Sequence, residues 1–177
     1  MPRPRLVSDD AVLDAASRVV ARAGPAGATL AAVGAECGLS AATLVQRFGS
    51  KRRLLLALSS RSVAAVTEGF ADARARHDDP VTALLEALAA QVAGLATPEA
   101  MANSLAFLHL DLVDDEFRAV ALDVWRAMRT EIAATLGTGD DVARRVLVAY
   151  NGSLITWAVE RDGPLADRLR ADVLAVL

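Results

Sequence analysis

Two consecutive short segments, followed by a longer one, each begin at a hydroxyl residue, and this pattern constrains the fold more than any other feature. The hydroxyl residues are Thr29, Ser40 and Ser50, and the glycines that separate the segments are Gly38 and Gly49. Hydroxyl side chains cap the free amides at a helix start, and glycine is typical of a helix end. The spacing predicts helices over about 30–37, over about 41–48, and from residue 51 toward residue 75. Such short helices must pack together as one compact unit.

The rest of the chain shows the same caps, breaks and helical periodicity. Ser8, followed by two aspartates, opens a helix that Gly24 and Pro25 end. Breaks near residues 77–80, 96–98, 114–116, 137–141 and 163–164 delimit five further helices. The composition agrees, because alanine is frequent and aromatic residues are only 4%. We predict an all-α fold of about nine helices and no strand.

The hydropathy pattern predicts a cytoplasmic protein without a membrane segment. The most apolar run covers residues 146–159 and is shorter than the roughly 20 residues that span a bilayer. No apolar signal region follows the basic N-terminus. The run therefore predicts a buried helix.

The net charge of −3 conceals an uneven distribution. Residues 1–60 carry eight basic and four acidic side chains, a net charge of +4, whereas residues 61–177 carry eleven and eighteen, a net charge of −7. A basic N-terminal third is typical of a surface that meets nucleic acid. The segment at residues 2–5 is compatible with a basic arm that enters the minor groove, although such arms are more often disordered tails.

The segment from Thr29 to Lys51 has the spacing of a helix-turn-helix, whose second helix enters the major groove of DNA. That helix offers Thr43, Gln46 and Arg47 on its outer side. Arginine pairs bidentately with guanine, and glutamine with adenine. Ser40 and Lys51 stand at helix starts, where a hydroxyl, free amides and a cation hold phosphates. Thr29 and Ala41, at the starts of the two helices, complete the predicted DNA-binding set.

Over residues 8–60 the chain resembles the tetracycline-repressor (TetR) family of transcriptional regulators. The resemblance rests on the stretches 29–34, 38–40, 43–44 and 48–55, which read TLAAVG, GLS, TL and FGSKRRLL. It implies a helical homodimer with N-terminal helix-turn-helix domains. A small molecule in the C-terminal domain would change the separation of the two DNA-binding domains, and the last two helices would form the dimer interface.

Three positions depart from the family's pattern. Val45 stands where the family usually has tyrosine, Arg47 where it usually has histidine, and Ala41 where it often has a basic residue. Valine cannot donate a hydrogen bond to a phosphate. These changes are expected to alter operator affinity or sequence without changing the fold.

We divide the chain into a DNA-binding domain, residues 1–53, and a ligand-binding and dimerisation domain, residues 54–177. Bulky side chains in an alanine-rich background favour a mostly apolar pocket in the second domain. The residues predicted to line it are Met101, Phe107, His109, Trp125, Met128 and Asn151. Each of them is also compatible with an ordinary core or surface position.

The function predicted from these features is that of a repressor. It would bind a palindromic operator in double-stranded DNA and leave it when a small hydrophobic effector binds. The alternative is a helical interaction module that has lost specific DNA recognition, which Val45 and Ala41 make conceivable. Enzymatic function is not expected, because no phosphate-binding glycine loop, nucleophile elbow or Glu-x-x-His pair is present. No metal or cofactor is expected, and the single cysteine, Cys37, excludes an internal disulfide.

Overall fold

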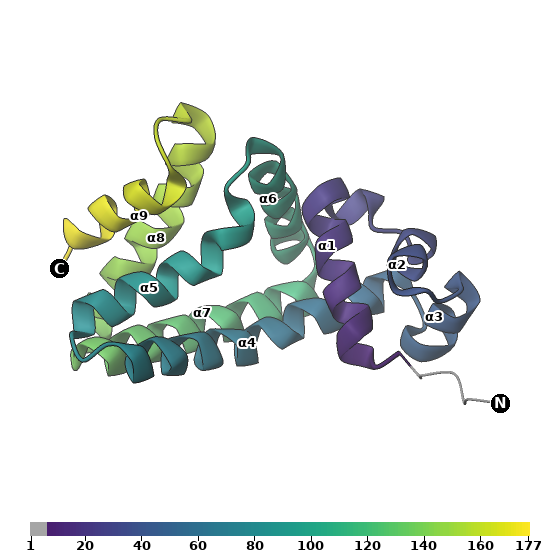
Figure 1. Cartoon of the computed structure of the whole chain (residues 1–177), viewed down its shortest axis with the longest axis horizontal. Helices are drawn as coiled ribbons and strands as arrows, with labels where there is room; N and C mark the ends of the chain where they lie inside the picture. Colours follow the sequence, from purple (N-terminus) through teal and green to yellow (C-terminus); the bar gives the residue numbers. More distant parts are fainter. Residues whose placement is uncertain (1–6) are drawn as a thin grey trace.

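The computed structural model describes residues 7–177, so the basic segment at residues 2–5 lies outside the described part (Figure 1). Residues 7–177 form nine α-helices, one short 3-10 turn and no strand, which confirms the all-α prediction. The helices are α1 (Asp9–Gly27), α2 (Leu30–Cys37), α3 (Ala41–Phe48), α4 (Lys51–Arg76), α5 (Pro80–Val92), α6 (Pro98–Val113), α7 (Asp115–Leu136), α8 (Asp140–Glu160) and α9 (Leu165–Leu174). The 3-10 turn η1 (Ala93–Leu95) follows α5.

The predicted hydroxyl caps form as expected. Thr29 Oγ1 accepts from the Ala32 amide at 3.1 Å, Ser40 Oγ from the Thr43 amide at 3.1 Å, and Ser50 Oγ from the Arg53 amide at 3.2 Å. Gly38 ends α2 in the left-handed region, at φ 74°. Glycine adopts that conformation without the steric penalty of a side chain. The bounds of α2 and α3 therefore follow from local sequence alone.

The break predicted at Gly24 lies inside α1, where the helix is interrupted and then resumes. Gly24 adopts φ 67° and ψ 173°, and Pro25 follows it. Proline has no amide hydrogen, so the Ala21 carbonyl loses its helical partner. The Asn103 side chain from α6 supplies a replacement, with its Nδ2 donating to the Ala21 oxygen at 2.8 Å. The break in α1 thus becomes a point of attachment to α6.

Two hydrophobic clusters divide the interior. We call the first the head cluster; its buried members are Val12, Leu13, Ala15, Ala16, Val19, Ala28, Val33, Leu44, Leu54, Leu55 and Phe117. The second, the body cluster, is centred on Phe70, Leu84, Leu88, Ile132, Val146 and Leu169. The head cluster takes most of its residues from α1 to α4, but Phe117 comes from the first turn of α7. A residue far away in sequence therefore completes the N-terminal core.

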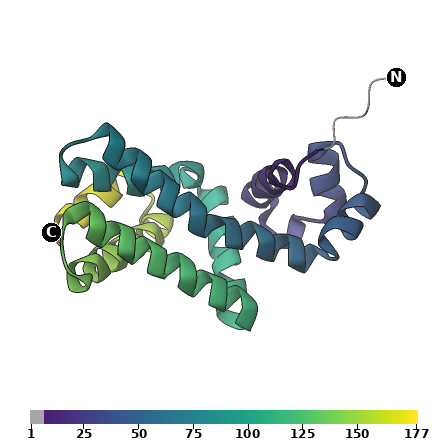
Figure 2. The ribbon, with the colours of Figure 1, turned by 90° about the horizontal axis from the view of Figure 1, so that it is seen from below.

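The long helix α4 connects the two clusters. It begins beside α3 and runs into the body, where it packs along α7 and α5 (Figures 1 and 2). Within residues 7–177, α4 is the one helix long and apolar enough to cross a membrane by length and composition, and 22% of its apolar window is buried. The pair formed by Pro80–Leu95 and Pro98–Val113 passes the same test only if counted as one segment bent by 99°. In this fold α4 instead joins the head to the body.

Candidate functional site

The geometry of the helix-turn-helix depends on close contact between α2 and the turn before α3. A Cβ on Gly34 would lie 2.4 Å from the Leu39 carbonyl oxygen, which is well inside van der Waals distance. The Leu39 amide in turn donates to the Gly34 carbonyl at 2.9 Å. Val33 and Leu44 are fully buried between the helices. Burial of Leu44 leaves the opposite side of α3 facing outward.

Ion pairs hold α1 against its neighbours. Arg18 and Arg22 both contact Glu36 of α2, at 2.9 and 2.6 Å, and their guanidinium groups lower the pKa of that carboxyl. Arg61 of α4 pairs with Asp14 at 2.7 Å. These pairs are exposed, so each stabilises the fold weakly. They favour one orientation of α2 and α3 relative to α1.

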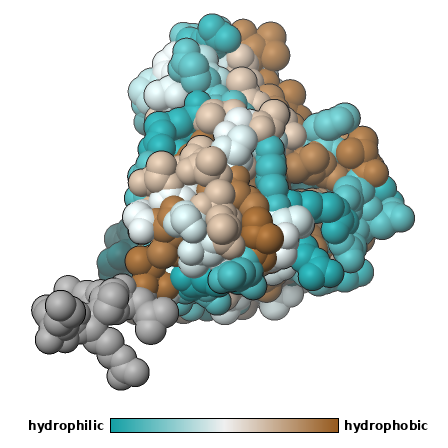
Figure 3. Space-filling model, turned by 90° about the vertical axis from the view of Figure 1, so that its right-hand side faces the viewer, coloured by the Kyte–Doolittle hydropathy of each residue, from teal (hydrophilic) through white to brown (hydrophobic). Residues whose placement is uncertain are grey.

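The polar residues predicted to meet DNA lie along α3 and at helix starts. Ser40 and Gln46 are exposed, Thr43 is half-buried, and the two hydroxyls of Ser40 and Thr43 lie 2.9 Å apart. Ala41 is half-buried, and Thr29 is exposed at the start of α2. Figure 3 views this end of the molecule, where hydrophilic and apolar residues are mixed. The predicted residues therefore lie at one end of the molecule, the end formed by α2 and α3.

The Arg47 side chain is hydrogen-bonded to the start of α1. Its Nε donates to Asp9 Oδ1 at 2.8 Å, a terminal nitrogen contacts the same carboxylate, and another donates to the Val7 carbonyl at 2.8 Å. The guanidinium also lies 5.9 Å from the centre of the Phe48 ring. To pair with a guanine, Arg47 must leave Asp9.

Lys51 is likewise engaged with the protein. Its Nζ donates to the Ala26 carbonyl at 2.6 Å, just after the break in α1. The sequence gives no sign of this contact, because it depends on how the Gly24–Pro25 break folds back. An aspartate at position 9 is already explained in the sequence as a favourable charge at a helix start. The sequence therefore does not indicate that Asp9 also binds Arg47.

Two further arginines near the motif escape the sequence analysis. Arg53 is exposed and forms no ion pair within residues 7–177, so it is a free cation beside α3. Arg52 donates to both carboxylate oxygens of Asp114, at 2.9 and 2.8 Å, and contacts Glu116. Hydrogen bonding to Arg52 lowers the pKa of Asp114. Because Asp114 also caps α7, this pair joins the starts of α4 and α7.

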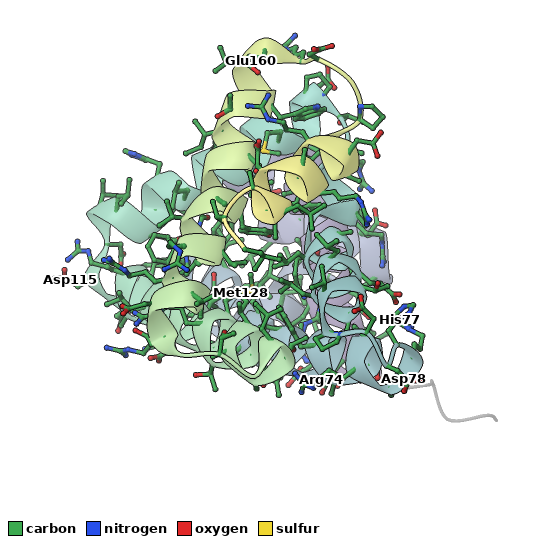
Figure 4. The ribbon with its side chains drawn as sticks, turned by 90° about the vertical axis from the view of Figure 1, so that its left-hand side faces the viewer. Arg74, His77, Asp78, Asp115, Met128 and Glu160 are labelled. Atoms are coloured by element: carbon green, nitrogen blue, oxygen red, sulfur yellow. The ribbon has the colours of Figure 1, made fainter. Side chains whose placement is uncertain are left out.

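A cavity of about 480 Å³ opens among α1, α4, α5, α6, α7 and α8. Five of the six predicted ligand-binding residues line it: Met101, Phe107, Trp125, Met128 and Asn151. His109 is exposed on α6 and does not reach the cavity. Figure 4 shows Met128 in the interior, in contrast to Asp115 and Glu160 at the periphery. Most of the wall is apolar, as is typical of small-molecule pockets.

The wall of the cavity includes part of α1. Ser17, Val20 and Ala21 line it, and the last of these carries the carbonyl to which Asn103 donates. The other walls come from the body and from the middle of α4. A molecule in the cavity would therefore touch the head and the body at once.

Four polar groups of the wall differ in how they are satisfied. Asn151 donates to the Leu147 carbonyl at 2.9 Å. Burial raises the pKa of Tyr150 to about 12 and the pKa of Asp111 to about 6. The hydroxyl oxygen of Ser59 is buried and has no hydrogen-bond partner within the described residues. The cavity thus holds polar groups that the protein leaves incompletely satisfied.

An apolar stripe runs along the outside of α8. Val148, Ile155 and Val159 are 67%, 51% and 79% exposed, at offsets that place them on one side of the helix. Among residues 7–177, by contrast, no group of three or more metal-binding side chains comes together. The features that remain to be explained are therefore the end formed by α2 and α3, the cavity and this stripe.

Comparison with known proteins accounts for the first of these features. Residues 12–58 match the family of bacterial regulatory proteins described as the tetR family. No curated protein sequence matches the chain.

Solved structures extend the similarity to the whole fold. A transcriptional regulator from Rhodococcus sp. Rha1 is similar with a TM-score of 0.75 and 18% identity, over 96% of each chain. A TetR transcription regulator from Haloarcula marismortui has a TM-score of 0.76 and 19% identity, over 95% of this chain and 93% of its own. The multidrug binding protein EbrR, complexed with proflavin, has a TM-score of 0.63 and 22% identity, over 94% of this chain and 97% of its own. Residues 12–58, which contain the helix-turn-helix at residues 29–51, thus match the tetR family of bacterial regulatory proteins, and the whole chain shares the fold of these solved regulators.

Proposed function

We propose that the chain is a homodimeric transcriptional repressor of the cytoplasm that leaves its operator when a small molecule enters the cavity. The observation that carries the proposal is the composition of the cavity wall, which α1 of the head shares with the body. Differential binding to two arrangements of head and body is what ligand control requires. A ligand that fits one arrangement of α1 better than another would shift the position of α3.

The DNA-binding step follows from the outward side of α3. Gln46 is exposed for contact with base edges, and Arg47 reaches them after exchanging Asp9 for a guanine. Lys51 would exchange the Ala26 carbonyl for a phosphate. Arg53, which forms no ion pair within residues 7–177, is free to contact a phosphate of the DNA backbone.

A second copy of the chain would cover the apolar stripe on α8. Burial of Val148, Ile155 and Val159 is favourable in water, and their helix lies at the end of the body opposite α3 (Figure 1). A dimer through α8 and α9 would present two copies of α3 to half-sites about 34–36 Å apart, or a multiple of this spacing. Such an operator is palindromic, as the two-fold axis requires.

The structural neighbour EbrR supports a ligand in the cavity, because that protein is known from its complex with proflavin. The cavity here has enough volume for a molecule of two or three rings. Its mostly apolar wall supports a small hydrophobic effector. A release mechanism through α1 needs no contact between the effector and DNA.

DNA binding is tested with the palindromic sequences that flank the chain's own gene. We expect binding that weakens steeply with salt, because phosphate contacts release counterions. Arg47→Ala is expected to relax base preference, at about 1–3 kcal/mol for the lost bidentate pair, whereas Lys51→Ala weakens all sequences alike. Fluorescence anisotropy with operator and scrambled duplexes measures both. Equal losses of specificity in the two variants would contradict these roles.

The competing function is a helical interaction module without specific DNA recognition. The exposed Val45 favours it, since valine offers no hydrogen bond to a phosphate. Selection from random duplexes separates the two functions. A regulator enriches a palindrome, whereas a module that has lost recognition enriches no motif.

Release of Arg47 from Asp9 leads to a prediction of increased affinity. Asp9→Asn removes the carboxylate that binds Arg47 and one negative charge near the phosphates, so operator affinity should rise severalfold. Asp10→Asn is the matched control, because Asp10 occupies the same helical turn and, within residues 7–177, forms no hydrogen bond or ion pair with Arg47. Titration of both variants at one salt concentration makes the measurement. The same gain in both would assign the effect to net charge alone.

A further inference from the structure

The effector cavity contains one carboxylate and no positive charge. Asp111 is the one charged side chain among the residues that line it, on α1, α4, α5, α6, α7 and α8 alike. It is half-buried, and within residues 7–177 it forms neither an ion pair nor a hydrogen bond. Glu131, another half-buried carboxylate, is by contrast paired with Arg74 at 2.7 Å. Asp111 is thus a negative charge left without a protein partner.

The position of Asp111 on α6 adds to the instability of its charge. It lies in the last turn of the helix, which ends at Val113. The negative end of the helix dipole disfavours a carboxylate there. Burial acts in the same direction and raises the pKa of Asp111 to about 6. A cation in the cavity would relieve both effects.

A second unsatisfied group belongs to a residue of the cavity wall. The Ser59 hydroxyl oxygen, on α4, is buried and has no partner within residues 7–177, although a buried hydroxyl normally forms a hydrogen bond. Carboxylate and hydroxyl oxygens both accept from an N–H group. The rest of the wall offers aromatic rings, among them Phe107, Trp125 and Tyr150. Aromatic rings attract cations through their faces.

From this arrangement we propose that the effector is an amphiphilic organic cation that bears at least one N–H group, with its charged nitrogen on Asp111 and its apolar part against the rings. The proposal rests on the repressor function proposed above and specifies the chemical class of its effector. Neutral molecules would bind more weakly because they leave the Asp111 charge unpaired. Anions would be excluded by repulsion.

Three probes of one ring system test the class: 1-naphthylmethylamine, which is protonated at neutral pH, 1-naphthylmethanol, which is neutral, and 1-naphthylacetate, which is an anion. Calorimetry with the full chain and no DNA is expected to show the amine bound at least about tenfold more tightly than the alcohol, as for a charge-assisted hydrogen bond. The anion should bind most weakly. Equal affinities for amine and alcohol would overturn the proposal.

Variants localise the effect to the cavity. Asp111→Asn keeps the shape of the side chain and should abolish the preference for the amine, while the affinity for the alcohol changes by less than about threefold. Asp123→Asn is the matched control, because Asp123 loses an equal charge on the surface of α7, where it pairs with Arg126. A preference that survives Asp111→Asn would also overturn the proposal.

Binding of the amine should depend on pH. Asp111 ionises near pH 6, so affinity should rise from pH 5 to pH 7 and then level off. Tyr150, the other titratable residue of the wall, stays neutral over this range. His109 lies two residues before Asp111 on the exposed side of α6, and His109→Gln should leave the profile unchanged. A profile that is flat, or that disappears with His109→Gln, would contradict the assignment to Asp111.

A parallel titration of operator-bound protein separates the two proposals. Amine binding that is selective but leaves the operator complex intact supports the cation site and contradicts the repressor mechanism. If the three probes bind with equal affinity and none of them releases the operator, the cation site is overturned and the repressor function still stands.

Discussion

Phe117→Ala is expected to lower the free energy of unfolding by about 3–5 kcal/mol, the usual range for removing a buried phenylalanine. The ring is 2% exposed and lies edge-on to Phe107, with centroids 5.9 Å apart. The Arg52 guanidinium lies 5.7 Å above it. Its loss removes the one residue of α7 from the head cluster and leaves Phe107 and Arg52 without their packing partner. Chemical denaturation followed by circular dichroism measures the change.

The position of Phe117 also determines where the loss should be felt. Hydrogen exchange should increase over α1, α2 and α3, which the head cluster stabilises. Phe70→Ala is the matched control, because Phe70 is fully buried in the body cluster and loses the same atoms. It should destabilise the chain by a similar amount with increased exchange along α4 and α5. Identical exchange patterns for the two variants would show that head and body unfold as one unit.

Among the described glycines, Gly34 leaves the least space for an added methyl group, and Gly34→Ala is therefore expected to have a large effect. The added Cβ would meet the Leu39 carbonyl oxygen at 2.4 Å, and this atom belongs to the backbone and cannot rotate away. Either α2 and the turn separate or the turn loses its bond from the Leu39 amide to the Gly34 carbonyl. Overpacking of this kind destabilises by about 1–3 kcal/mol or more. Because the movement shifts α3, operator binding should fall further than stability alone explains.

Gly94→Ala provides the comparison. Gly94 lies in the 3-10 turn after α5, and within residues 7–177 no atom beyond its own residue and its chain neighbours lies within 4 Å of the position of its Cβ. Its stability and its operator affinity should stay close to those of the unmodified chain. Thermal denaturation and anisotropy on the same samples make both measurements. Normal operator affinity in Gly34→Ala would mean that α3 tolerates movement of the turn.

Sequence reasoning predicts the helices of this chain well because their ends are determined locally. The caps Thr29, Ser40 and Ser50 act within three residues, so α2 and α3 can be placed to the residue. The break at Gly24 follows equally from glycine beside proline. What happens after the break does not, since the return of α1 depends on Asn103, 82 residues further along.

The candidate sites show the same division between local and tertiary causes. The residues of α3 can be assigned a face from their spacing, but the partners of Arg47 and Lys51 come from α1 and cannot be seen in the motif. On α6, Phe107 reaches the cavity and His109 does not, although they stand two residues apart. Residues two apart lie on nearly opposite sides of a helix, and the sequence alone does not reveal which side of α6 is covered by α4 and α7. Ser59 and Asp111 become notable only once the cavity is known.

The head cluster limits how this protein can be recombined with its relatives. Consider a chimera in which a relative's DNA-binding segment replaces residues 1–53 of this chain. The junction would fall just before Leu54 and Leu55, and Phe117 would remain as this chain's residue in the core of the relative's helices. The donor helices would then meet a foreign residue in their core and a foreign partner for Arg52. Exchange of operator specificity therefore requires the first turn of α7 to travel with the N-terminal helices. In this chain the modular unit is a set of contacts rather than a stretch of sequence.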